Sequence, residues 1–461
     1  MYTGTPRSPV RRRAQSTFVR PSLRHPARLV PLAFLGVAAV GTGLLSLPIS
    51  REGSDAAEPI TALFTAVSAV CVTGLVTVDT GTYWSGFGEV VIAALMQVGG
   101  FGIMTMASLL GLIVSGRMRL SDKLVTATET KMLGLGDVRK VVVRVALVAI
   151  CVETVVAVIL GLQFRFSYDY APAKAAWYGI FHAVAAFNSG GFALYSDSLE
   201  SFVTDPVVIL PVTIASLVGG IGFPVVVELI RRTFKPSKWS IHTKITVLGT
   251  GVLLAAGFVF YLAIEWNNAK TLGPLDIQHK IQAAFFSAAM PRSAGFNAVP
   301  TGDLRPETWA VTDILMFIGG GSAGTAGGIK VATFFLLAFV IWAEVRGEPD
   351  VSVFGRRIPH STQRQALTVA LMGVAAVACG TIALLFASDA PFDQLLFEVT
   401  SAFGTAGLST GLTGDLNNAG QIVIIVLMFA GRVGTVAVAT ALALRVRHRR
   451  FRFPEERPIV G

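Results

Sequence analysis

Four short stretches of the chain read alike: Val72-Thr73-Gly74-Leu75, Ser189-Gly190-Gly191-Phe192, Ser293-Ala294-Gly295-Phe296 and Thr405-Ala406-Gly407-Leu408. Each ends a short apolar segment, and the closing glycines lie 117, 104 and 112 residues apart. A second glycine cluster follows each stretch by 24 to 28 residues, at Gly99-Gly100-Phe101-Gly102, Gly219-Gly220-Ile221-Gly222, Gly319-Gly320-Gly321 and Gly431-Arg432-Val433-Gly434. A unit that recurs four times predicts a fourfold arrangement around one axis, and in a membrane that arrangement would be a pore.

The composition is typical of a protein embedded in a lipid bilayer. Of the 461 residues, 53% are hydrophobic and only 14% are charged, whereas a soluble chain of this length would form two or three domains with far more charge. Uncharged runs such as 29–47, 245–264 and 366–387 reach the ~20 residues needed to cross a bilayer core. We therefore expect an all-α polytopic membrane protein.

The basic residues are sorted by membrane side, so the net charge of +10 does not indicate nucleic-acid binding. Eight spans are predicted, near 29–47, 90–114, 145–162, 207–227, 245–264, 314–343, 366–387 and 422–444. With Lys330 of the interrupted span 314–343 assigned to the same side, the connections on one side and both chain ends carry 30 Lys+Arg against 9 Asp+Glu, and those on the other side carry 7 against 18. The positive-inside rule then places both termini in the cytoplasm, as eight crossings require, and the location expected for the chain is the cell membrane, a bacterial plasma membrane.

Each repeat reads as a first span (M1), a short apolar segment, a glycine turn and a second span (M2). The short segments, 59–71, 176–187, 277–290 and 392–403, are too short to cross, so they are predicted to be re-entrant pore helices. The expected fold is four tandem M1–pore helix–M2 repeats with pseudo-fourfold symmetry around a central pore, with 8 transmembrane spans plus 4 re-entrant pore helices. The predicted boundaries are a basic cytoplasmic tail at 1–28, repeats at 29–115, 140–230, 245–345 and 364–445, and a cytoplasmic C-terminal tail at 446–461.

The turn after each short helix would lie at membrane depth, where backbone polar groups must face water, protein or an ion. Glycine permits the backbone conformations that such a turn requires. Carbonyl groups from four turns can replace the hydration shell of a cation. The alternative is that these glycines only allow close helix packing, but four glycines at matching places favour a pore.

In these motifs the chain resembles the Trk/Ktr/HKT superfamily of potassium transporters, most closely its KtrB-type membrane subunits. The most specific matches are Phe187-Asn188-Ser189-Gly190-Gly191-Phe192, Arg292-Ser293-Ala294-Gly295-Phe296-Asn297, the 319–330 stretch and Gly431-Arg432-Val433-Gly434. Gly190 departs from the pattern, since a bulkier residue is expected before the second filter glycine. The resemblance covers about residues 29–445 and implies potassium uptake through a channel-like pore.

The resemblance implies a K⁺ selectivity filter, the only metal-ion site expected. Its residues are Val72, Thr73, Gly74, Asn188, Ser189, Gly190, Gly191, Ser293, Ala294, Gly295, Thr405, Ala406 and Gly407. In plant relatives a serine at the first filter glycine goes with sodium transport, so Gly74 favours potassium. A sodium-conducting or Na⁺-coupled cation transporter of the same fold is the alternative.

A glycine-rich stretch interrupts the second span of the third repeat. It contains G-x-G-x-x-G, but it lies inside an apolar span without a preceding strand, so it does not indicate a nucleotide site. Six glycines in twelve residues disfavour a regular helix. The resemblance implies an intramembrane gate made of Gly319, Gly320, Gly321, Ser322, Ala323, Gly324, Thr325, Ala326, Gly327, Gly328 and Lys330. A glycine-rich packing kink is the alternative.

With Lys330 assigned to the cytoplasmic side, two charges remain inside the predicted spans, and intramembrane charges are functional by default. The resemblance places Arg432 beneath the filter as a barrier against tight trapping of cations, and bonding to helix-end carbonyls is the structural alternative. For Glu153 a packing or interface role is favoured over ion coupling. One aspartate follows each filter glycine, by 5, 6, 8 and 8 residues: Asp79, Asp197, Asp303 and Asp415. These aspartates either concentrate cations at an outer mouth of the pore or cap helices.

The resemblance also implies partners. Such proteins commonly form homodimers on a cytosolic ring of RCK-type, KtrA-like nucleotide-binding regulatory subunits, for which 115–144, 228–244, 344–364 and 445–461 are candidate docking segments. No cofactor is expected on this chain: K⁺ is the transported ion, Na⁺ is a candidate activator, and nucleotide regulation would act only through the partner. An enzyme is not expected, because Glu153 and Arg432 alone cannot supply clustered catalytic groups.

Overall fold

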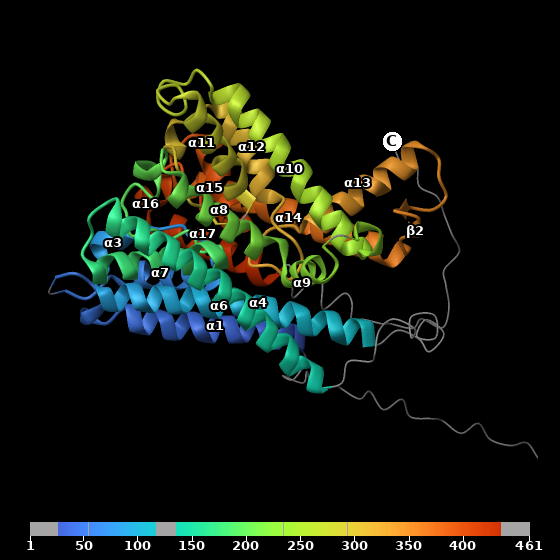
Figure 1. Ribbon diagram of the computed structural model, residues 1–461, viewed down its shortest axis with the longest axis horizontal. Helices are drawn as coiled ribbons and strands as arrows, with labels where there is room; N and C mark the ends of the chain where they lie inside the picture. The colour runs from blue at the N-terminus through green and yellow to red at the C-terminus, as the bar shows by residue number, and fades with distance from the viewer. Residues whose placement is uncertain (1–25, 54, 117–134, 234, 293, 435–461) are drawn as a thin grey trace, which may run out of the picture.

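The protein is described by a computed structural model, which covers residues 26–53, 55–116, 135–233, 235–292 and 294–434. It is mostly helical (Figure 1). The first repeat holds α1 (Pro26–Leu45), α2 (Pro59–Cys71), α3 (Thr80–Tyr83) and α4 (Gly86–Gly116), and the second holds α6 (Leu135–Phe166), α7 (Pro172–Asn188), α8 (Pro206–Ile221) and α9 (Phe223–Arg232). The third holds α10 (Ile241–Glu265), α11 (Ile277–Ala289), α12 (Pro306–Phe317) and α13 (Val331–Val345), and the fourth holds α14 (His360–Ala387), α15 (Phe392–Gly404), α16 (Leu412–Asp415) and α17 (Asn418–Phe429).

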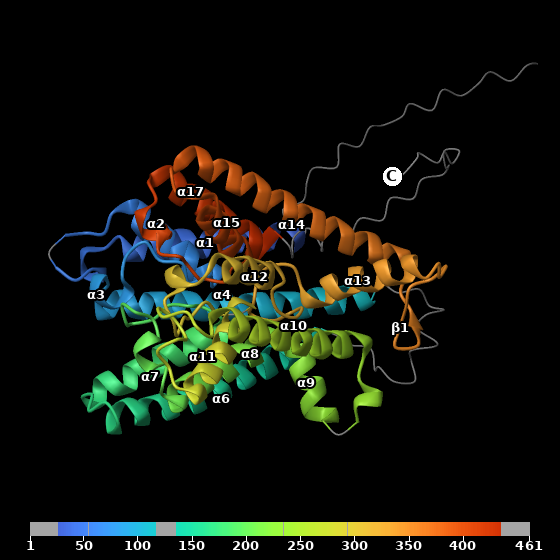
Figure 2. The ribbon, with the colours of Figure 1, turned by 90° about the horizontal axis from the view of Figure 1, so that it is seen from above.

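Short elements connect these helices. The 3₁₀ turns are η1 (Pro48–Ser50), η2 (Glu200–Phe202), η3 (Pro236–Lys238), η4 (Met290–Arg292) and η5 (Thr301–Asp303), and a π-helical turn, η6 (Ala430–Gly434), follows α17. Strands β1 (Ser352–Val353) and β2 (Arg356–Arg357) form an antiparallel hairpin. The connection with α3 lies at one end of the molecule, and α9 and the hairpin lie at the opposite end (Figures 1 and 2).

The four short apolar segments are helical, as expected, although α7 begins at Pro172, four residues before its predicted start. Three of the four short helices end in a residue with left-handed backbone geometry, Val72, Ser189 or Thr405, with φ of 53°, 63° and 47°. The next amide then bonds back to the helix, as when Thr73 N–H donates to the Ser68 carbonyl over 2.8 Å. This is the usual way to stop an α-helix sharply, and it directs the chain into the glycine turn.

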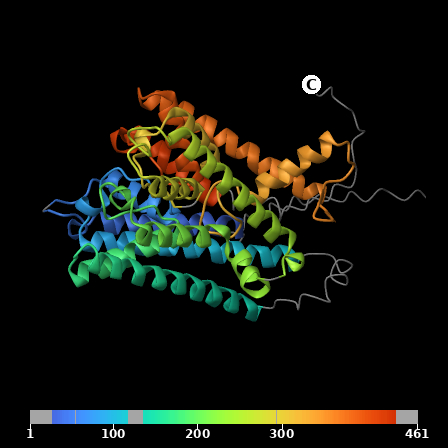
Figure 3. The same cartoon turned by 45° about the horizontal axis from the view of Figure 1, so that its top comes forward.

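The long helices surround the short ones (Figures 2 and 3). All but three of the thirteen residues of α2 are buried, whereas α14 exposes large apolar side chains such as Leu371 (60%) and Phe386 (90%). An apolar outer surface around a buried set of short helices is the arrangement expected of a protein surrounded by lipid.

The predicted eight single-helix crossings are present only in part. Among the described residues, α4, α6, α10 and α14 are long and apolar enough to cross a membrane. The span predicted near 207–227 is not one straight helix, because α8 ends at Ile221 and α9 leaves it at 102°; taken together, the two helices are long and apolar enough to form one bent span. Gly222 has a φ of +100°, which ends the helix, and Pro224 in the next turn cannot donate a backbone hydrogen bond. The predicted interruption of 314–343 is present, between α12 and α13.

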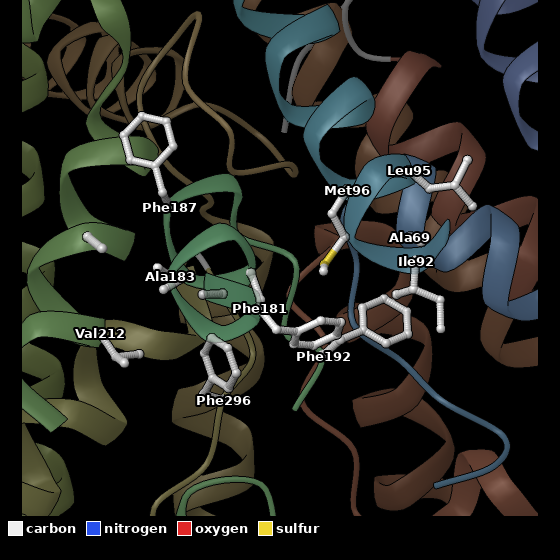
Figure 4. Close-up of a cluster of buried hydrophobic side chains, with 14 of the residues drawn as sticks. Ala69, Ile92, Leu95, Met96, Phe181, Ala183, Phe187, Phe192, Val212 and Phe296 are labelled. Carbon is white, nitrogen blue, oxygen red and sulfur yellow. The ribbon is translucent and has the colours of Figure 1, made fainter. Parts of the chain in front are cut away.

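The residue after each closing glycine is buried in the apolar core. Leu75 is 1% exposed, Phe192 and Phe296 are 0%, and Leu408 is 6%. Phe192 lies in one cluster with Phe181, Met96 and Ile92 (Figure 4). These buried side chains hold the end of each glycine turn against the surrounding helices.

Candidate functional site

The four closing glycines meet at one place, although they are more than a hundred residues apart in sequence. A methyl group placed on Gly74 would lie 2.7 Å from the carbonyl oxygen of Gly190, and one on Gly191 would lie 2.7 Å from that of Ala294. A methyl group on Gly295 would collide with the Ala406 oxygen, and one on Gly407 would collide with the Thr73 oxygen. Each turn therefore contacts the next in sequence order, and the fourth contacts the first. The result is a closed ring.

Carbonyl oxygens from equivalent positions approach this ring. They belong to the residues just before the closing glycines: Thr73, Gly190, Ala294 and Ala406. The glycines have φ of 90°, 68°, 65° and 89°, a region that residues with a side chain rarely adopt. The short helices also end here, and the C-terminal end of a helix carries partial negative charge. Oxygen ligands and helix C-termini both favour a cation.

Two hydroxyls at the turns have no hydrogen-bond partner among the described residues: Thr73 Oγ1 and Thr405 Oγ1, both buried. Buried polar atoms normally have a partner, so these two are available to a ligand. Ser293, another predicted filter residue, lies outside the residues that the structure describes.

The second set of glycines has a different role. A methyl group on Gly99, Gly219 or Gly431 would collide with the carbonyl oxygen of Val70, Phe187 or Phe403, each near the end of a short helix. The third repeat differs. A methyl group on Gly319 would collide with the Gly327 carbonyl of its own loop, and α12 is instead approached by Gly404 of the fourth short helix, where a methyl group would lie 2.5 Å from the Met316 oxygen. In the first, second and fourth repeats these glycines let the second helix contact its short helix at backbone distance, which is the packing role proposed for such residues in membranes.

The loop between α12 and α13 lies directly beside the second turn. Ser189 Oγ and Thr325 Oγ1 are 2.7 Å apart. Gly321 N–H donates to the Gly220 carbonyl over 2.8 Å, and Thr325 N–H donates to the Gly219 carbonyl over 3.0 Å. The break at Gly222 leaves these carbonyls at the end of α8 without partners in their own helix. The loop that interrupts the third repeat therefore completes the helix that is broken in the second.

Arg432 bonds to this loop. Its side chain is 2% exposed, lies in the π-helical turn η6, and donates through Nη1 to the Thr325 carbonyl. Its Nε and Nη2 have no hydrogen-bond partner within the described ranges. Lys330 donates from Nζ to the carbonyls of Ala326 (2.5 Å) and Gly327 (3.3 Å). Thus Arg432 bonds to the loop from η6, and Lys330 bonds within the loop itself.

The four predicted outer aspartates have different local roles. Asp79 caps α3 by accepting from Gly81 N–H over 2.9 Å, and Asp197 accepts from Ser201 N–H over 3.0 Å. Asp303 pairs with Lys270 at 2.8 Å. Asp415 is exposed at the end of α16. Helix capping is therefore observed for Asp79, while the charge of Asp303 is partly balanced by a lysine.

Sequence reasoning missed a buried carboxylate on the fourth short helix. Glu398 is 0% exposed and accepts from Ser409 Oγ, from the Thr410 N–H and hydroxyl, and from Thr413 Oγ1. It holds the segment that follows the fourth turn. An acid in the middle of the short apolar segment, where the other acid of the segment, Asp393, lies at its start, was the signal that could have identified it.

Glu153 lies closer to the turns than expected. Helix α6 is peripheral, but the Glu153 side chain is 9% exposed and accepts from Asn188, the last residue of α7. The side-chain nitrogen of Asn188 donates to this carboxylate, to Gln97 and to the Val184 carbonyl, while its Oδ1 has no hydrogen-bond partner among the described residues.

Comparisons with known proteins agree with this geometry. The sequence matches the TrkH family model, described as a cation transport protein, over residues 22–449. It is 38% identical to the Ktr system potassium uptake protein B of Bacillus subtilis, over 95% of this chain and 97% of the relative. It is 36% identical to the protein of the same name from Vibrio alginolyticus, over 94% of each chain. The potassium/sodium uptake protein NtpJ of Enterococcus hirae is 32% identical over 95% of this chain and 97% of the relative. The structure of the potassium transporter TrkH from Vibrio parahaemolyticus shares the fold, with a TM-score of 0.70 at 16% identity over 92% of this chain and 86% of that one.

The family match defines the class of this protein as a membrane protein that transports cations rather than an enzyme. The chain belongs to the TrkH family of cation transport proteins. The resemblance to the Trk/Ktr/HKT superfamily and its KtrB-type subunits is confirmed.

Proposed function

We propose that this chain is the pore-forming subunit of a Ktr-type system and takes up K⁺ across the bacterial cell membrane, with both termini in the cytoplasm. The closed ring of four turns at the ends of four short helices carries this proposal. The names of the relatives, two of which are potassium uptake proteins, support K⁺ as the ion.

The ring supplies the selectivity filter. Carbonyls of Thr73, Gly190, Ala294 and Ala406, with the neighbouring filter residues, replace the hydration shell of the ion. The short helices direct their negative ends toward it. A tenfold preference between K⁺ and Na⁺ corresponds to only ~1.4 kcal/mol, so a shift of one carbonyl is enough to change selectivity.

The loop 319–330 acts as the intramembrane gate. It contacts the second turn through Thr325 and Ser189, and Arg432 fastens it from the side. To conduct, the loop leaves its bonds to Gly219 and Gly220 at the end of α8. Helix α9 follows that end directly, and Phe223 N–H donates to the Ala323 carbonyl of the loop over 3.3 Å. Movement of α9 would therefore be transmitted to the gate.

The protein works with partners. The word "system" in the names of the relatives supports a multi-component assembly. We propose a homodimer on an RCK-type nucleotide-binding regulatory subunit, with 228–244 as a docking segment because it includes the second half of α9. No cofactor is bound by the chain itself, and Na⁺ serves as an activator.

The test is uptake of radioactive Rb⁺ into proteoliposomes that contain the purified chain, with K⁺ or Na⁺ as competitor. We expect K⁺ to compete far better than Na⁺. The variant Gly74→Ser should reduce this preference about tenfold, because its Cβ would lie 2.7 Å from the Gly190 oxygen.

The matched control is Gly411→Ser. Gly411 also has a positive φ, of +99°, but a methyl group there meets nothing within 4 Å. Both variants bear the conformational cost of about 1–2 kcal/mol for a left-handed residue, so only the collision with the ring differs. Equal competition by K⁺ and Na⁺ in the wild type would refute a potassium filter and favour the sodium-conducting alternative, to which the name of NtpJ gives some support.

A further inference from the structure

The first and fourth turns are held by a serine of their own short helix. Gly74 N–H donates to Ser68 Oγ over 3.1 Å, and Ser68 Oγ donates to the Leu75 carbonyl over 2.7 Å. In the fourth repeat, Gly407 N–H donates to Ser401 Oγ over 3.1 Å. Each serine lies six residues before the closing glycine. One hydroxyl thus holds the backbone of each of these two turns.

The second and third turns have no such serine. The residues six positions before Gly191 and Gly295 are Ala185 and Ala289, which carry no hydrogen-bonding side chain. Instead, the residue three positions before each of these glycines is a long polar one, Asn188 or Arg292. The same position in the first and fourth repeats is occupied by Cys71 and Gly404. Each turn therefore has one of two kinds of candidate anchor.

The second kind of anchor reaches outward to the first long helix of its own repeat. Arg292 is 5% exposed and donates from Nη1 to the Thr250 carbonyl (3.2 Å) and from Nη2 to Thr250 Oγ1 (3.3 Å), on α10. Asn188 is 1% exposed and donates from Nδ2 to Glu153 Oε1 over 2.9 Å, on α6.

The contacts of Asn188 form a small closed network. Its Nδ2 also donates to Gln97 Oε1 over 2.6 Å, and Gln97 Nε2 donates to Glu153 Oε2 over 3.1 Å. Both carboxylate oxygens of Glu153 therefore accept a hydrogen bond. Gly100 leaves the space for this network, because a methyl group there would lie 2.8 Å from Asn188 Cγ.

A carboxylate is the group that satisfies this network. It faces two N–H donors, and hydrogen bonds to an ionised acceptor are about twice as strong as neutral ones. A glutamine at the same position would present one acceptor and one NH₂ group, so either Asn188 or Gln97 would face another donor. An ionised side chain inside a membrane is costly, and it persists where it has a specific role.

We propose that Glu153 is a positioning residue for ion selection, because it holds Asn188 and Asn188 in turn holds the second turn. In the first and fourth turns this task belongs to Ser68 and Ser401. Glu153 does not touch the ion. This inference rests on the proposed function, because it assumes that the ring selects K⁺.

The experiment measures the ratio of the Na⁺ and K⁺ inhibition constants for radioactive Rb⁺ uptake in proteoliposomes. Loss of protein from misfolding lowers the rate but leaves this ratio unchanged, so the ratio reports on the turn itself. We expect Glu153→Ala to lower the ratio about tenfold and Glu153→Gln to lower it by about twofold to threefold. Ser68→Ala should lower it in a similar way through the other kind of anchor.

The decisive variant restores an anchor of the other kind. Ala185→Ser places a hydroxyl six residues before Gly191, where Ser68 and Ser401 lie in their repeats, so Glu153→Ala combined with Ala185→Ser should regain most of the ratio. Val155→Ala is the matched control on α6, because Val155 is 54% exposed on the opposite side, and it should leave the ratio unchanged.

The outcomes separate the two proposals. A wild type without preference for K⁺ would refute the proposed function. A selective wild type whose ratio is unchanged in Glu153→Ala would refute the positioning role alone, and if that variant does not fold, an unchanged ratio in Glu153→Gln would do the same.

Discussion

The bond between Arg432 and the loop 319–330 makes the strongest prediction about transport rate. Arg432→Gln removes both the hydrogen bond to the Thr325 carbonyl and the only positive charge of the described part of α17 and η6. The remaining bonds of the loop to α8, at Gly219 and Gly220, are unchanged. The variant should therefore release the loop without altering the ring.

The size of the effect follows from the kind of bond that is lost. A hydrogen bond from a charged donor stabilises its geometry by about 1.5–3 kcal/mol. Since ~1.4 kcal/mol is a factor of ten in an equilibrium constant, the displaced loop should become roughly tenfold to hundredfold more populated. If the displaced loop is a minor state that limits flux, the rate rises by a similar factor.

The assay is the initial rate of Rb⁺ uptake per reconstituted protein, with K⁺ and Na⁺ competition measured alongside. The rate should increase at least about tenfold while the preference for K⁺ is retained, because the ring carbonyls are not altered. Arg432→Lys keeps the charge but not the guanidinium geometry, so it separates release of the loop from loss of an electrostatic barrier. Arg346→Gln removes an exposed positive charge at the end of α13 and should have no effect.

An unchanged rate in folded Arg432→Gln would refute the role of this residue in the gate. A loss of ion preference would instead show that Arg432 supports the ring. Either result would favour the structural alternative, in which Arg432 only bonds to a backbone carbonyl and does not control the gate.

Two further predictions concern carboxylates outside the gate. Glu398→Ala leaves the donors of Ser409, Thr410 and Thr413 without their acceptor, so it should lower the free energy of unfolding by about 2–4 kcal/mol, measured as a lower melting temperature in detergent. The control is Asp393→Ala at the exposed start of α15, which should leave the melting temperature unchanged. Equal melting temperatures for the two variants would contradict the anchoring role of Glu398. Burial, followed by the charge of Asp197, raises the pKa of Glu200 from 4.5 to about 7, so its stabilising contribution is fully present below pH 4.5 and is lost as pH rises through about 7. Melting temperature should therefore fall over this window more in the wild type than in Glu200→Gln, and parallel curves would show that Glu200 does not titrate there.

Local sequence patterns were sufficient for most elements of this fold, but not for the break between α8 and α9. The short apolar segments, such as 59–71 and 392–403, were identified because helix length and apolar run length are properties of neighbouring residues. The unwound segment at 319–330 followed from its glycines, which weaken a helix wherever they occur. The break at Gly222 was missed although Gly222 and Pro224 are adjacent signals, because the apolar run around them continues without interruption.

The candidate site depended on contacts that no local pattern contains. Asn188 bonds to Gln97 across 91 residues, and Ser189 meets Thr325 across 136. The sequence could show that Glu153 is a charge in an apolar helix, but it could not show that its side chain faces Asn188 rather than lipid.

The sequence by itself determined that four similar units lie in a membrane, that each contains a short helix ending in a glycine turn, and where the charges lie along the chain. These features depend on hydrophobicity, glycine and charge, which act within a few residues. Only the tertiary structure decided that the turns close into a ring in the order first, second, third, fourth, and that the second set of glycines serves packing. It also decided which side chain anchors each turn. These features arise from backbone groups that approach within a few ångströms after folding, and the steric and hydrogen-bonding requirements of such approaches exist only when distant segments are brought together.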